Sequence, residues 1–200
     1  MIETINYQDH DKPVYEILGF INDVPELQDK KFLGYPVLGG SEIISELVGR
    51  EDVCFINNLY QPDDRKKIAQ IFKEAGCKVV SLIHPTVNTS YVNCNVGCII
   101  PEGCIIGPEV KIGSYVAFRN NALALHNTTI GSFCFIGPGA ILCGYVTLEE
   151  RCFIGAGATL IPHVKIGAGS IIGAGSTVSK DIPGNKIAAG TPARIIKNNT

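Results

Sequence analysis

Apolar residues recur at every sixth position through the second half of the chain. Counting in sixes from Ile100 to Val178 meets fourteen apolar side chains in succession, and glycine directly follows seven of them. The fifth residue of each hexapeptide, from Cys104 to Ser176, is always Cys, Val, Ala, Thr or Ser. A period of six fits neither an α-helix nor a single amphipathic strand, and it is typical of short strands and turns wound into a parallel β-helix. We therefore predict a solenoid with the first and fifth positions inside.

The fourth position of the hexapeptide predicts where the chain turns. It repeatedly holds glycine or asparagine, the residue types that tolerate a positive φ angle most readily. These residues are Gly103, Asn121, Asn127, Gly139, Gly157, Gly169 and Gly175. We expect them at the corners of the solenoid, and we expect the segment 182–197 to cap its open end.

The first half of the chain has a different pattern, in which apolar runs alternate with amphipathic stretches. Strands are predicted at 14–21, 53–56 and 78–83, and helices at 41–49 and 62–76. Alternating strands and helices favour a parallel sheet. Pro85 holds the residue before it extended, and the composition changes just beyond it. We therefore predict two domains, 1–86 and 87–200.

Charge narrows the possible partners. The chain has 200 residues, with 17 basic side chains against 19 acidic ones and a formal net charge of −2. This balance offers no broad cationic surface for nucleic acid or for an anionic membrane. The opening segment 1–13 lacks the apolar core of a signal peptide, and no apolar run approaches the ~18 residues of a membrane span. We predict a cytoplasmic protein that neither inserts into membranes nor binds nucleic acid.

Eight cysteines raise the question of a metal site, and Cys94 and Cys98 have a spacing similar to a zinc motif. Their place in the repeat argues against that interpretation. Cys94 occupies a first position, and the cysteines at fifth positions are Cys98, Cys104, Cys134 and Cys152. Free cysteine packs as a small hydrophobe, so we predict reduced thiols in the core and no metal.

Several stretches of the sequence resemble one family. They are GFINDVPEL and GYPVLGG in the first half, SLIHPTV at the junction, and NALALHNTTIG, CFIGAGATLIPHVKIGAGSIIGAGSTVSKDIP and AAGTPARIIK in the second half. Together they resemble the hexapeptide-repeat sugar O- and N-acyltransferases, typified by sialic-acid O-acetyltransferase and by bacterial enzymes that acetylate UDP- or GDP-linked 4-amino sugars. The resemblance implies a truncated Rossmann-like α/β domain followed by a left-handed parallel β-helix, with three hexapeptides, or eighteen residues, in each coil.

His126 is the candidate catalytic residue. It occupies a third position, at a corner that points away from the core, and an eighteen-residue coil places Gly144 in the same column, where a glycine leaves space for a ligand. From the residues alone, a solvated turn histidine fits at least as well. The resemblance implies that His126 takes a proton from the acceptor hydroxyl or amine as it attacks the thioester of acetyl-CoA. Asn127 stands where the family commonly has an acidic partner; an amide adds no charge, and asparagine also suits a corner.

The resemblance also implies a site for acetyl-CoA, the co-substrate, along small corner residues of the solenoid. The residues that match the family's cofactor contacts are Phe135, Gly144, Ala156 and Ala174, with Phe135 in place of a polar residue found in some relatives. Lys180 and Arg194 are candidates for the phosphates, although exposed cations near a chain end are more often only solvated. No metal is expected, because His126 and His163 are the only histidines of the repeat and hexapeptide carbonic anhydrases use three.

Candidate residues for a sugar nucleotide lie at loop ends of the first half: Asn22, Asp23, Asn57 and Asn58. Relatives open with a strand and a glycine-rich turn resembling G-x-G-G-H, which presents backbone N–H groups to phosphate. Here the segment 2–8 resembles the end of the helix after that turn, so the opening strand and turn are missing. We expect weak affinity for nucleotide sugars and intact binding of acetyl-CoA.

The resemblance predicts an acetyl-CoA-dependent acetyltransferase that modifies an amino or hydroxyl group of a nucleotide-linked sugar in surface-glycan synthesis. It also implies a homotrimer, with active sites between adjacent β-helices. Two alternatives stay open: an acetyltransferase for a non-sugar acceptor, similar to serine acetyltransferase, and a non-catalytic scaffold. The strand and helix alternation of the first half disagrees with the helical N-terminal domain of serine acetyltransferases. The sequence leaves the acceptor, and the choice between O- and N-acylation, open.

Overall fold

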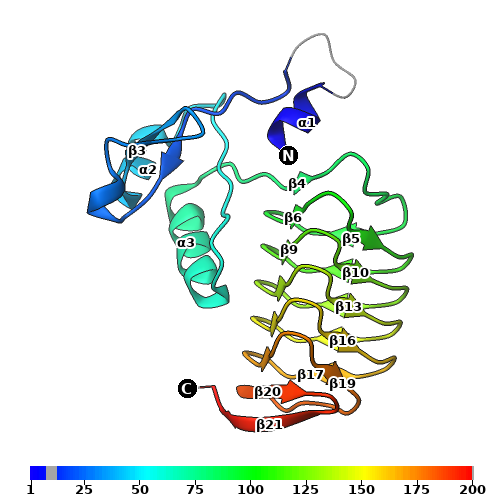
Figure 1. Ribbon diagram of the computed structural model, residues 1–200. Helices are drawn as coiled ribbons and strands as arrows, with labels where there is room; N and C mark the ends of the chain where they lie inside the picture. Colours follow the sequence, from blue (N-terminus) through cyan, green and yellow to red (C-terminus); the bar gives the residue numbers. More distant parts are fainter. Residues whose placement is uncertain (8–12, 200) are drawn as a thin grey trace.

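The computed structural model describes residues 1–7 and 13–199, and residues 8–12 of the opening segment lie outside the described part. Most of the chain forms a three-sided solenoid, and a smaller N-terminal part lies beside its upper end (Figure 1). The solenoid consists of short parallel strands stacked in three sheets. The strands between residues 93 and 178 pair at a spacing of eighteen residues, as Leu123 does with Ile141. The predicted coil length is therefore confirmed.

We name each face of the solenoid after its first strand. The β7 sheet contains β7 (Ile105–Ile106), β10 (Leu123–Ala124), β13 (Ile141–Leu142), β16 (Thr159–Leu160) and β19 (Thr177–Val178). The β5 sheet contains β5 (Asn93–Cys94), β8 (Lys111–Ile112), β11 (Thr129–Ile130), β14 (Thr147–Leu148) and β17 (Lys165–Ile166). The β4 sheet contains β4 (Leu82–Ile83), β6 (Ile99–Ile100), β9 (Ala117–Phe118), β12 (Phe135–Ile136), β15 (Phe153–Ile154), β18 (Ile171–Ile172), β20 (Lys186–Gly190) and β21 (Ala193–Asn198).

The core of the solenoid is built from the two inward positions of the repeat. Every first position from Ile100 to Val178 is buried, and so is every fifth position from Cys104 to Ser176. All eight cysteines are free, and the four at fifth positions are buried in this core. Burial raises the pKa of the Cys104 thiol to about 11, which keeps it protonated at neutral pH. The interpretation of these cysteines as packing thiols is confirmed.

The corners of the solenoid adopt a left-handed backbone conformation at the fourth position, as predicted for the glycines and asparagines. The same conformation occurs at corners where the residue type does not predict it: Glu109, Tyr115, Phe133, Tyr145, Arg151 and His163. A positive φ is uncommon for bulky residues. The coil geometry therefore imposes this angle at the corner whatever residue occupies it.

The C-terminal segment closes the lower end of the solenoid (Figure 1). Strand β20 pairs in parallel with β18, and β21 returns antiparallel along β20. Ala188 and Ala193, on these two strands, belong to the core of the solenoid. The predicted cap is therefore present.

The N-terminal part contains shorter elements than the sequence predicts. Its helices and strands are α1 (Ile2–Tyr7), β1 (Phe20–Ile21), a 3-10 turn (Pro25–Leu27), β2 (Lys31–Phe32), β3 (Tyr35–Gly39), a second 3-10 turn (Ser41–Ile43), α2 (Ile44–Leu47) and α3 (Pro62–Ala75). Strand β1 pairs in parallel with β3, and β2 pairs antiparallel with β3. The predicted strand 53–56 is reduced to one parallel bridge between Phe55 and Val79. The Rossmann-like pattern is thus only partly built.

The predicted strand 78–83 does not extend an N-terminal sheet. Its end forms β4, in which Leu82 pairs with Ile99 of β6 in the solenoid. The solenoid sheet thus begins before residue 87, and the division of the chain at 86 stays a prediction. Among the residues that the structure describes, no helix is long and apolar enough to cross a membrane.

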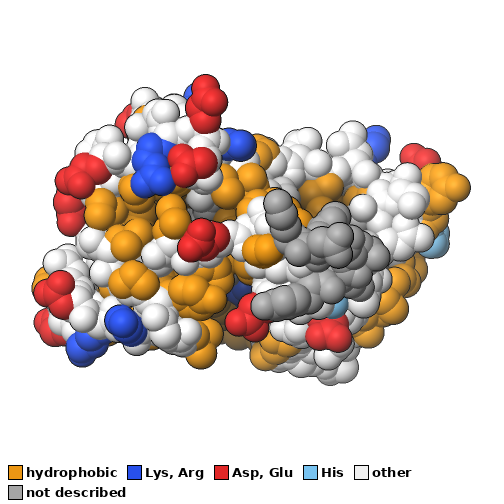
Figure 2. Space-filling model, turned by 90° about the horizontal axis from the view of Figure 1, so that it is seen from above, with side chains coloured by type: hydrophobic (Ala, Val, Ile, Leu, Met, Phe, Trp, Pro, Cys, Tyr) orange, Lys and Arg blue, Asp and Glu red, His pale blue; other side chains and the backbone are white. Residues whose placement is uncertain are grey.

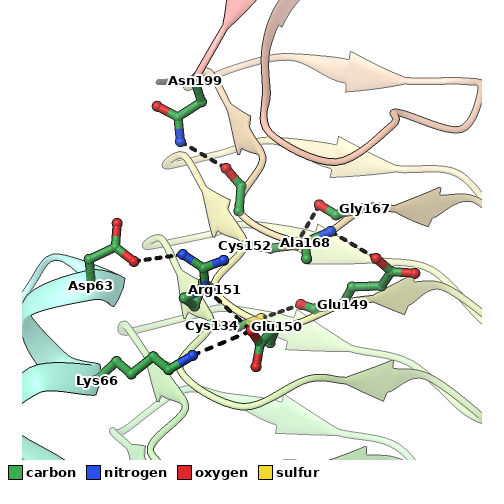
Figure 3. A network of polar contacts seen from close by, with 11 residues as sticks. Asp63, Lys66, Cys134, Glu149, Glu150, Arg151, Cys152, Gly167, Ala168 and Asn199 are labelled. Atoms are coloured by element: carbon green, nitrogen blue, oxygen red, sulfur yellow. Dashed lines mark hydrogen bonds and ion pairs between the residues drawn. The ribbon is translucent and has the colours of Figure 1, made fainter.

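Helix α3 attaches the N-terminal part to the solenoid. Pro62 begins the helix, Asp63 and Asp64 favour its N-terminus, and Gly76 ends it in the left-handed conformation at φ 74°. Ion pairs join its outer side to one corner of the solenoid: Asp63 with Arg151 at 2.9 Å and Lys66 with Glu150 at 3.5 Å (Figure 3). These pairs are partly exposed, so each contributes little stability.

The inner side of α3 places a guanidinium group in the interface with the solenoid. Arg65 is fully buried, and its Nη1 donates to the carbonyl oxygens of Tyr115 and Cys134, both at 3.2 Å. Its Nη2 donates to the Leu59 carbonyl, while its Nε has no hydrogen-bond partner among the described residues. Burial, together with the nearby Arg119, lowers the pKa of Arg65 to about 10. A buried cation held by carbonyl groups from both parts fixes how they dock.

Candidate functional site

His126 lies in the turn between β10 and β11, at the corner where the β7 sheet meets the β5 sheet. Its side chain is exposed, as the sequence predicts. The inward neighbours Ala124 and Thr128 are fully buried and fix the turn from both sides. The Thr128 hydroxyl also donates to the Leu125 carbonyl at 2.7 Å. A rigid solenoid corner therefore presents the imidazole to solvent.

Asn127 orients the imidazole. His126 Nδ1 and Asn127 Oδ1 are 3.1 Å apart, and the amide oxygen is only an acceptor. In the tautomer that donates this hydrogen bond, the neutral ring carries its proton on Nδ1 and presents an unprotonated Nε2, the form that a general base needs. Asn127 has φ 58°, so it combines the corner conformation with this hydrogen bond. The amide sets the tautomer but supplies no negative charge.

Gly144 lies one coil below His126, and the imidazole rests directly on it. A Cβ atom at Gly144 would lie 2.6 Å from Cε1, 2.7 Å from Nε2 and 3.1 Å from Nδ1 of His126. The two residues are thus brought together as the eighteen-residue spacing predicts. The space that the missing side chain leaves is occupied by the ring of His126, and a ligand contact at the Gly144 backbone stays a prediction.

Two residues beside this pair were not recognised as part of the site. Tyr145 lies edge-to-face with His126, with ring centroids 5.3 Å apart, and His163 stacks on Tyr145 at 4.8 Å. From the sequence we predict no role at His126 for either residue. The signal was available, because Asn127, Tyr145 and His163 are spaced by eighteen residues.

The predicted acetyl-CoA column lies at another corner. Ala156 and Ala174 are exposed in the turns before β16 and β19, where the β4 sheet meets the β7 sheet. His126 and Gly144 follow β10 and β13 at the opposite edge of the same β7 sheet. One chain therefore places the two columns at the two edges of a single face and does not bring them together.

Phe135 is not part of either column. It lies on β12 of the β4 sheet, is 3% exposed, and stacks on Phe153 with ring centroids 4.7 Å apart. Tyr60 of the N-terminal part covers both rings, at 4.6 Å from Phe135, and the Arg119 guanidinium lies 5.3 Å from the Phe135 ring. The side chain packs between the two parts of the molecule, so a contact with a cofactor would require Tyr60 to move.

The predicted sugar-site residues lie on two separate loops. Asn57 is 3% exposed, and its Nδ2 donates to the Arg65 carbonyl at 2.9 Å. This buried side chain supports α3 and is closed to solvent in this structure. Asn58 is exposed and accepts a hydrogen bond from Arg119 at 3.2 Å.

On the other loop, the Asn22 side chain accepts from the Val24 N–H at 2.9 Å, and the Asp23 side chain accepts from the Ser41 N–H at 2.5 Å. Both residues therefore shape turns around β1 and β3.

The two cations predicted for phosphate binding are exposed at the lower end of the solenoid, Lys180 after β19 and Arg194 on β21 (Figure 1).

Other features of the described residues lie apart from His126. A cavity of about 450 Å³ opens between the end of α2 and the end of α3, lined by Val48, Phe55 and Cys77 among others, and it contains none of the predicted site residues. Across residues 1–7 and 13–199, no group of three or more His, Cys, Asp or Glu side chains converges to hold a metal ion.

Comparison with known proteins agrees with this architecture. The family described as bacterial transferase hexapeptide (six repeats) matches residues 127–161 and 145–180. The bifunctional protein GlmU of Latilactobacillus sakei is 36% identical over 62 residues, which is 31% of this chain and 13% of that protein. The chain thus spans only a small part of that relative.

Solved structures match over most of the chain. PerB from Caulobacter crescentus, in complex with CoA and GDP-perosamine, is 31% identical, with a TM-score of 0.80 over 82% of this chain and 80% of that chain. The acetyltransferase domain of PglB from Neisseria gonorrhoeae, in complex with acetyl coenzyme A, is 26% identical, with a TM-score of 0.83 over 89% and 85%. The predicted fold class, an α/β part followed by a left-handed parallel β-helix, is confirmed. This chain belongs to the hexapeptide-repeat sugar acyltransferase family.

Proposed function

We propose that this chain transfers the acetyl group of acetyl-CoA to the amino group of a nucleotide-linked sugar. The observation that supports the proposal most directly is His126, an exposed histidine whose Nδ1 is held by Asn127 and whose Nε2 is free to accept a proton. The similarity to PerB, which was crystallised with CoA and GDP-perosamine, favours an amino sugar linked to a nucleotide. We place the reaction in the cytoplasm.

The proposed reaction is a direct acyl transfer. The acceptor nitrogen attacks the thioester carbon, and His126 Nε2 takes the proton that the nitrogen loses. The new C–N bond forms as the C–S bond breaks, and the leaving thiolate receives the proton from His126. The Asn127 amide keeps Nδ1 protonated throughout, so the ring returns to its starting tautomer.

The proposal includes a homotrimer in which a second copy completes the site. The β4 sheet is covered by the chain's own Tyr60 and α3, whereas the outward side chains of the β7 sheet include Ile105, Leu123 and Ile141. Ile105 is 56% exposed in the single chain. A neighbouring copy packed on the β7 sheet would cover these apolar side chains and bring its own Ala156 and Ala174 towards His126.

The contacts proposed for acetyl-CoA are the backbone at Gly144, Ala156 and Ala174, with Lys180 and Arg194 near the phosphates. Small corner residues suit this role because a pantetheine arm can lie close to the backbone. Asn22, Asp23 and Asn58 remain the proposed residues for the sugar nucleotide. The side chains of Phe135 and Asn57 are packed inside the protein and are left out of the proposed contacts.

A thiol-release assay tests the function. The chain is incubated with acetyl-CoA and a panel of UDP- and GDP-linked sugars, each amino sugar matched by its hydroxyl analogue, and free CoA is measured. Turnover with amino sugars and none with the analogues is the expected result. Turnover with the hydroxyl sugars would assign O-acylation, and absence of both turnover and CoA binding in calorimetry would overturn the proposal in favour of a scaffold.

Light scattering tests the assembly. The expected mass is three times the 21.4 kDa of the chain at micromolar concentration. A monomer mass under those conditions would contradict a site shared between copies.

A further inference from the structure

Three aromatic rings form a continuous stack along the corner that carries His126. The His126 and Tyr145 rings are perpendicular at 86°, and the Tyr145 and His163 rings are parallel at 8°. The backbone fixes their spacing, because the Tyr145 N–H donates to the His126 carbonyl at 3.1 Å and the His163 N–H donates to the Gly144 carbonyl at 3.2 Å. The rings are therefore held by the coil itself and do not depend on a flexible loop.

The backbone conformation of Tyr145 is unfavourable for a residue of its size. Its φ angle is 63°, a region that many corners of the solenoid reach with glycine or asparagine and that others reach with a bulkier residue, such as Glu109 or Arg151. A second aromatic pair, Tyr115 and Phe133, also occupies corners, but both rings are covered by the N-terminal part. Lys66 of α3 lies over the Phe133 ring, and Tyr115 packs against the buried apolar cluster that includes Phe55 and Phe72. No residue in the described part of the chain covers Tyr145 in this way, and its side chain is 48% exposed. Packing against the N-terminal part explains the aromatic residues at the corners of Tyr115 and Phe133. The corner of Tyr145 differs in that its ring contacts His126.

The proposed chemistry of His126 suggests a function for its contact with the Tyr145 ring. When Nε2 takes a proton, positive charge develops on the imidazole, and the hydrogen-bonded Asn127 offers a dipole but no charge to balance it. An aromatic face within about 6 Å of a cation attracts it through the ring quadrupole. The two rings are T-shaped, with centroids 5.3 Å apart, and since His163 stacks in parallel on Tyr145, we take the edge of His126 to meet the opposite face of Tyr145.

We propose that Tyr145 is a positioning residue for His126, which holds the imidazole edge-to-face and stabilises the imidazolium that forms during acyl transfer. The His163 ring stacks on Tyr145 and keeps the Tyr145 ring in place. The inference rests on the proposed function, because it concerns the protonation of His126 in that reaction. It assigns to an aromatic ring part of the task that a carboxylate at position 127 would perform.

Two substitutions separate the ring from its hydroxyl group. Tyr145→Leu removes the aromatic face and is expected to lower kcat about three- to tenfold, with the KM values for acetyl-CoA and the acceptor changed less than about twofold. Tyr145→Phe keeps the face and is expected to retain wild-type kcat within about twofold. Since leucine at a positive φ can impair folding, Tyr145→Asn provides a second ring-free variant that suits the corner. His163→Ala is expected to fall between wild type and Tyr145→Leu.

A double-mutant cycle tests the link to charge. Asn127→Asp places a carboxylate beside Nδ1 and is expected to make the kcat loss from Tyr145→Leu smaller than in the wild-type background. Equal losses in both backgrounds, a wild-type kcat in Tyr145→Leu and Tyr145→Asn, or a Tyr145→Phe variant as slow as Tyr145→Leu would each overturn the proposal.

A measurement without turnover keeps the inference separate from the proposed function. In NMR of the side chains, three-bond couplings are expected to report a single χ1 rotamer of His126 in the wild-type chain and an average over rotamers in Tyr145→Leu and Tyr145→Asn. A single rotamer in all three proteins would overturn the positioning role. If the wild-type chain acetylates nothing, the proposed function fails, while the NMR result still decides whether Tyr145 orients His126.

Discussion

The solenoid and the N-terminal part of this chain bury their apolar residues in different ways. In the solenoid, each inward side chain stacks on its equivalent eighteen residues away, so Ile136, Ile154 and Ile172 are all completely buried. The N-terminal part leaves Leu33 at 93% and Val14 at 48% exposure, and hydrophobic side chains gather on its surface in the view from above (Figure 2). Its buried apolar cluster is small, consisting of Ile44, Val53, Phe55 and Phe72, and α3 joins it to the solenoid.

This difference indicates which part provides a rigid site. Repeating units stabilise one another through neighbouring coils, and the cost of an unfavourable corner is shared with the coils above and below. His126 is placed by that stack, whereas Asn22 and Asn57 depend on short elements and on the docking of α3. The proposed chemistry accordingly lies on the solenoid, and the N-terminal part is the place where specificity for an acceptor can vary.

The largest expected effect concerns the solenoid site. His126→Ala should lower kcat by a factor on the order of 10²–10⁴, the usual loss for a general base, because no other described group takes the position of Nε2. Thiol release from acetyl-CoA measures the loss, and the melting temperature should stay unchanged because the side chain is exposed. Thr129→Ala, on an exposed position of β11, is the matched control. Full activity of His126→Ala would place the chemistry outside this corner.

The next effect concerns the joint between the two parts. Arg65→Ala should weaken the docking of α3 by about 2–4 kcal/mol, because it leaves buried carbonyl groups without donors and opens a cavity. Hydrogen exchange of α3 amides measures the change, with amides of β13 and β16 as the internal reference. Arg65→Met should recover the part of the docking free energy that is lost to the cavity, because methionine fills it. Lys73→Ala, at an exposed position of α3, should have no effect. Equal loosening of the solenoid amides would show that the two parts unfold together.

A third variant distinguishes two uses of glycine within the solenoid. Gly144→Ala should lower kcat about 10- to 100-fold with little change in melting temperature, because the added Cβ meets the movable ring of His126 and displaces it. Gly137→Ala places its Cβ 2.6 Å from the Ala156 backbone nitrogen, so it should lower the melting temperature instead. Kinetics and thermal melting of both proteins test the contrast, and a Gly144→Ala enzyme with wild-type kcat would contradict it.

The smallest effect is expected at the rim of the α3 interface. Asp63→Asn removes the ion pair with Arg151, and since the carboxylate is 69% exposed, the free energy of unfolding should fall by less than about 1 kcal/mol. Urea unfolding at low and high salt measures this, and the difference from wild type should shrink as salt screens the pair. A loss as large as that of Arg65→Ala would mean that the rim, rather than the buried guanidinium, holds the two parts together.

The sequence by itself determined the solenoid, its inward positions and the corner that carries His126, whereas the eighteen-residue coil was implied by the resemblance to the family. Helix 62–75 was also predictable, because Pro62 and Gly76 mark its ends. These features are local or strictly periodic, so each residue's environment follows from neighbours at fixed spacing. The eighteen-residue spacing also places Tyr145 one coil below Asn127, beside His126.

Only the tertiary structure decided how the two parts meet. It made β4 a strand of the solenoid, covered Phe135 with Tyr60, buried Arg65 with no acidic partner among the described residues, and closed Asn57 to solvent. None of these contacts has a period, and each joins residues far apart in the chain. Their formation depends on which surfaces remain uncovered once the solenoid has folded, and hydrophobic patterning along the sequence does not contain that information.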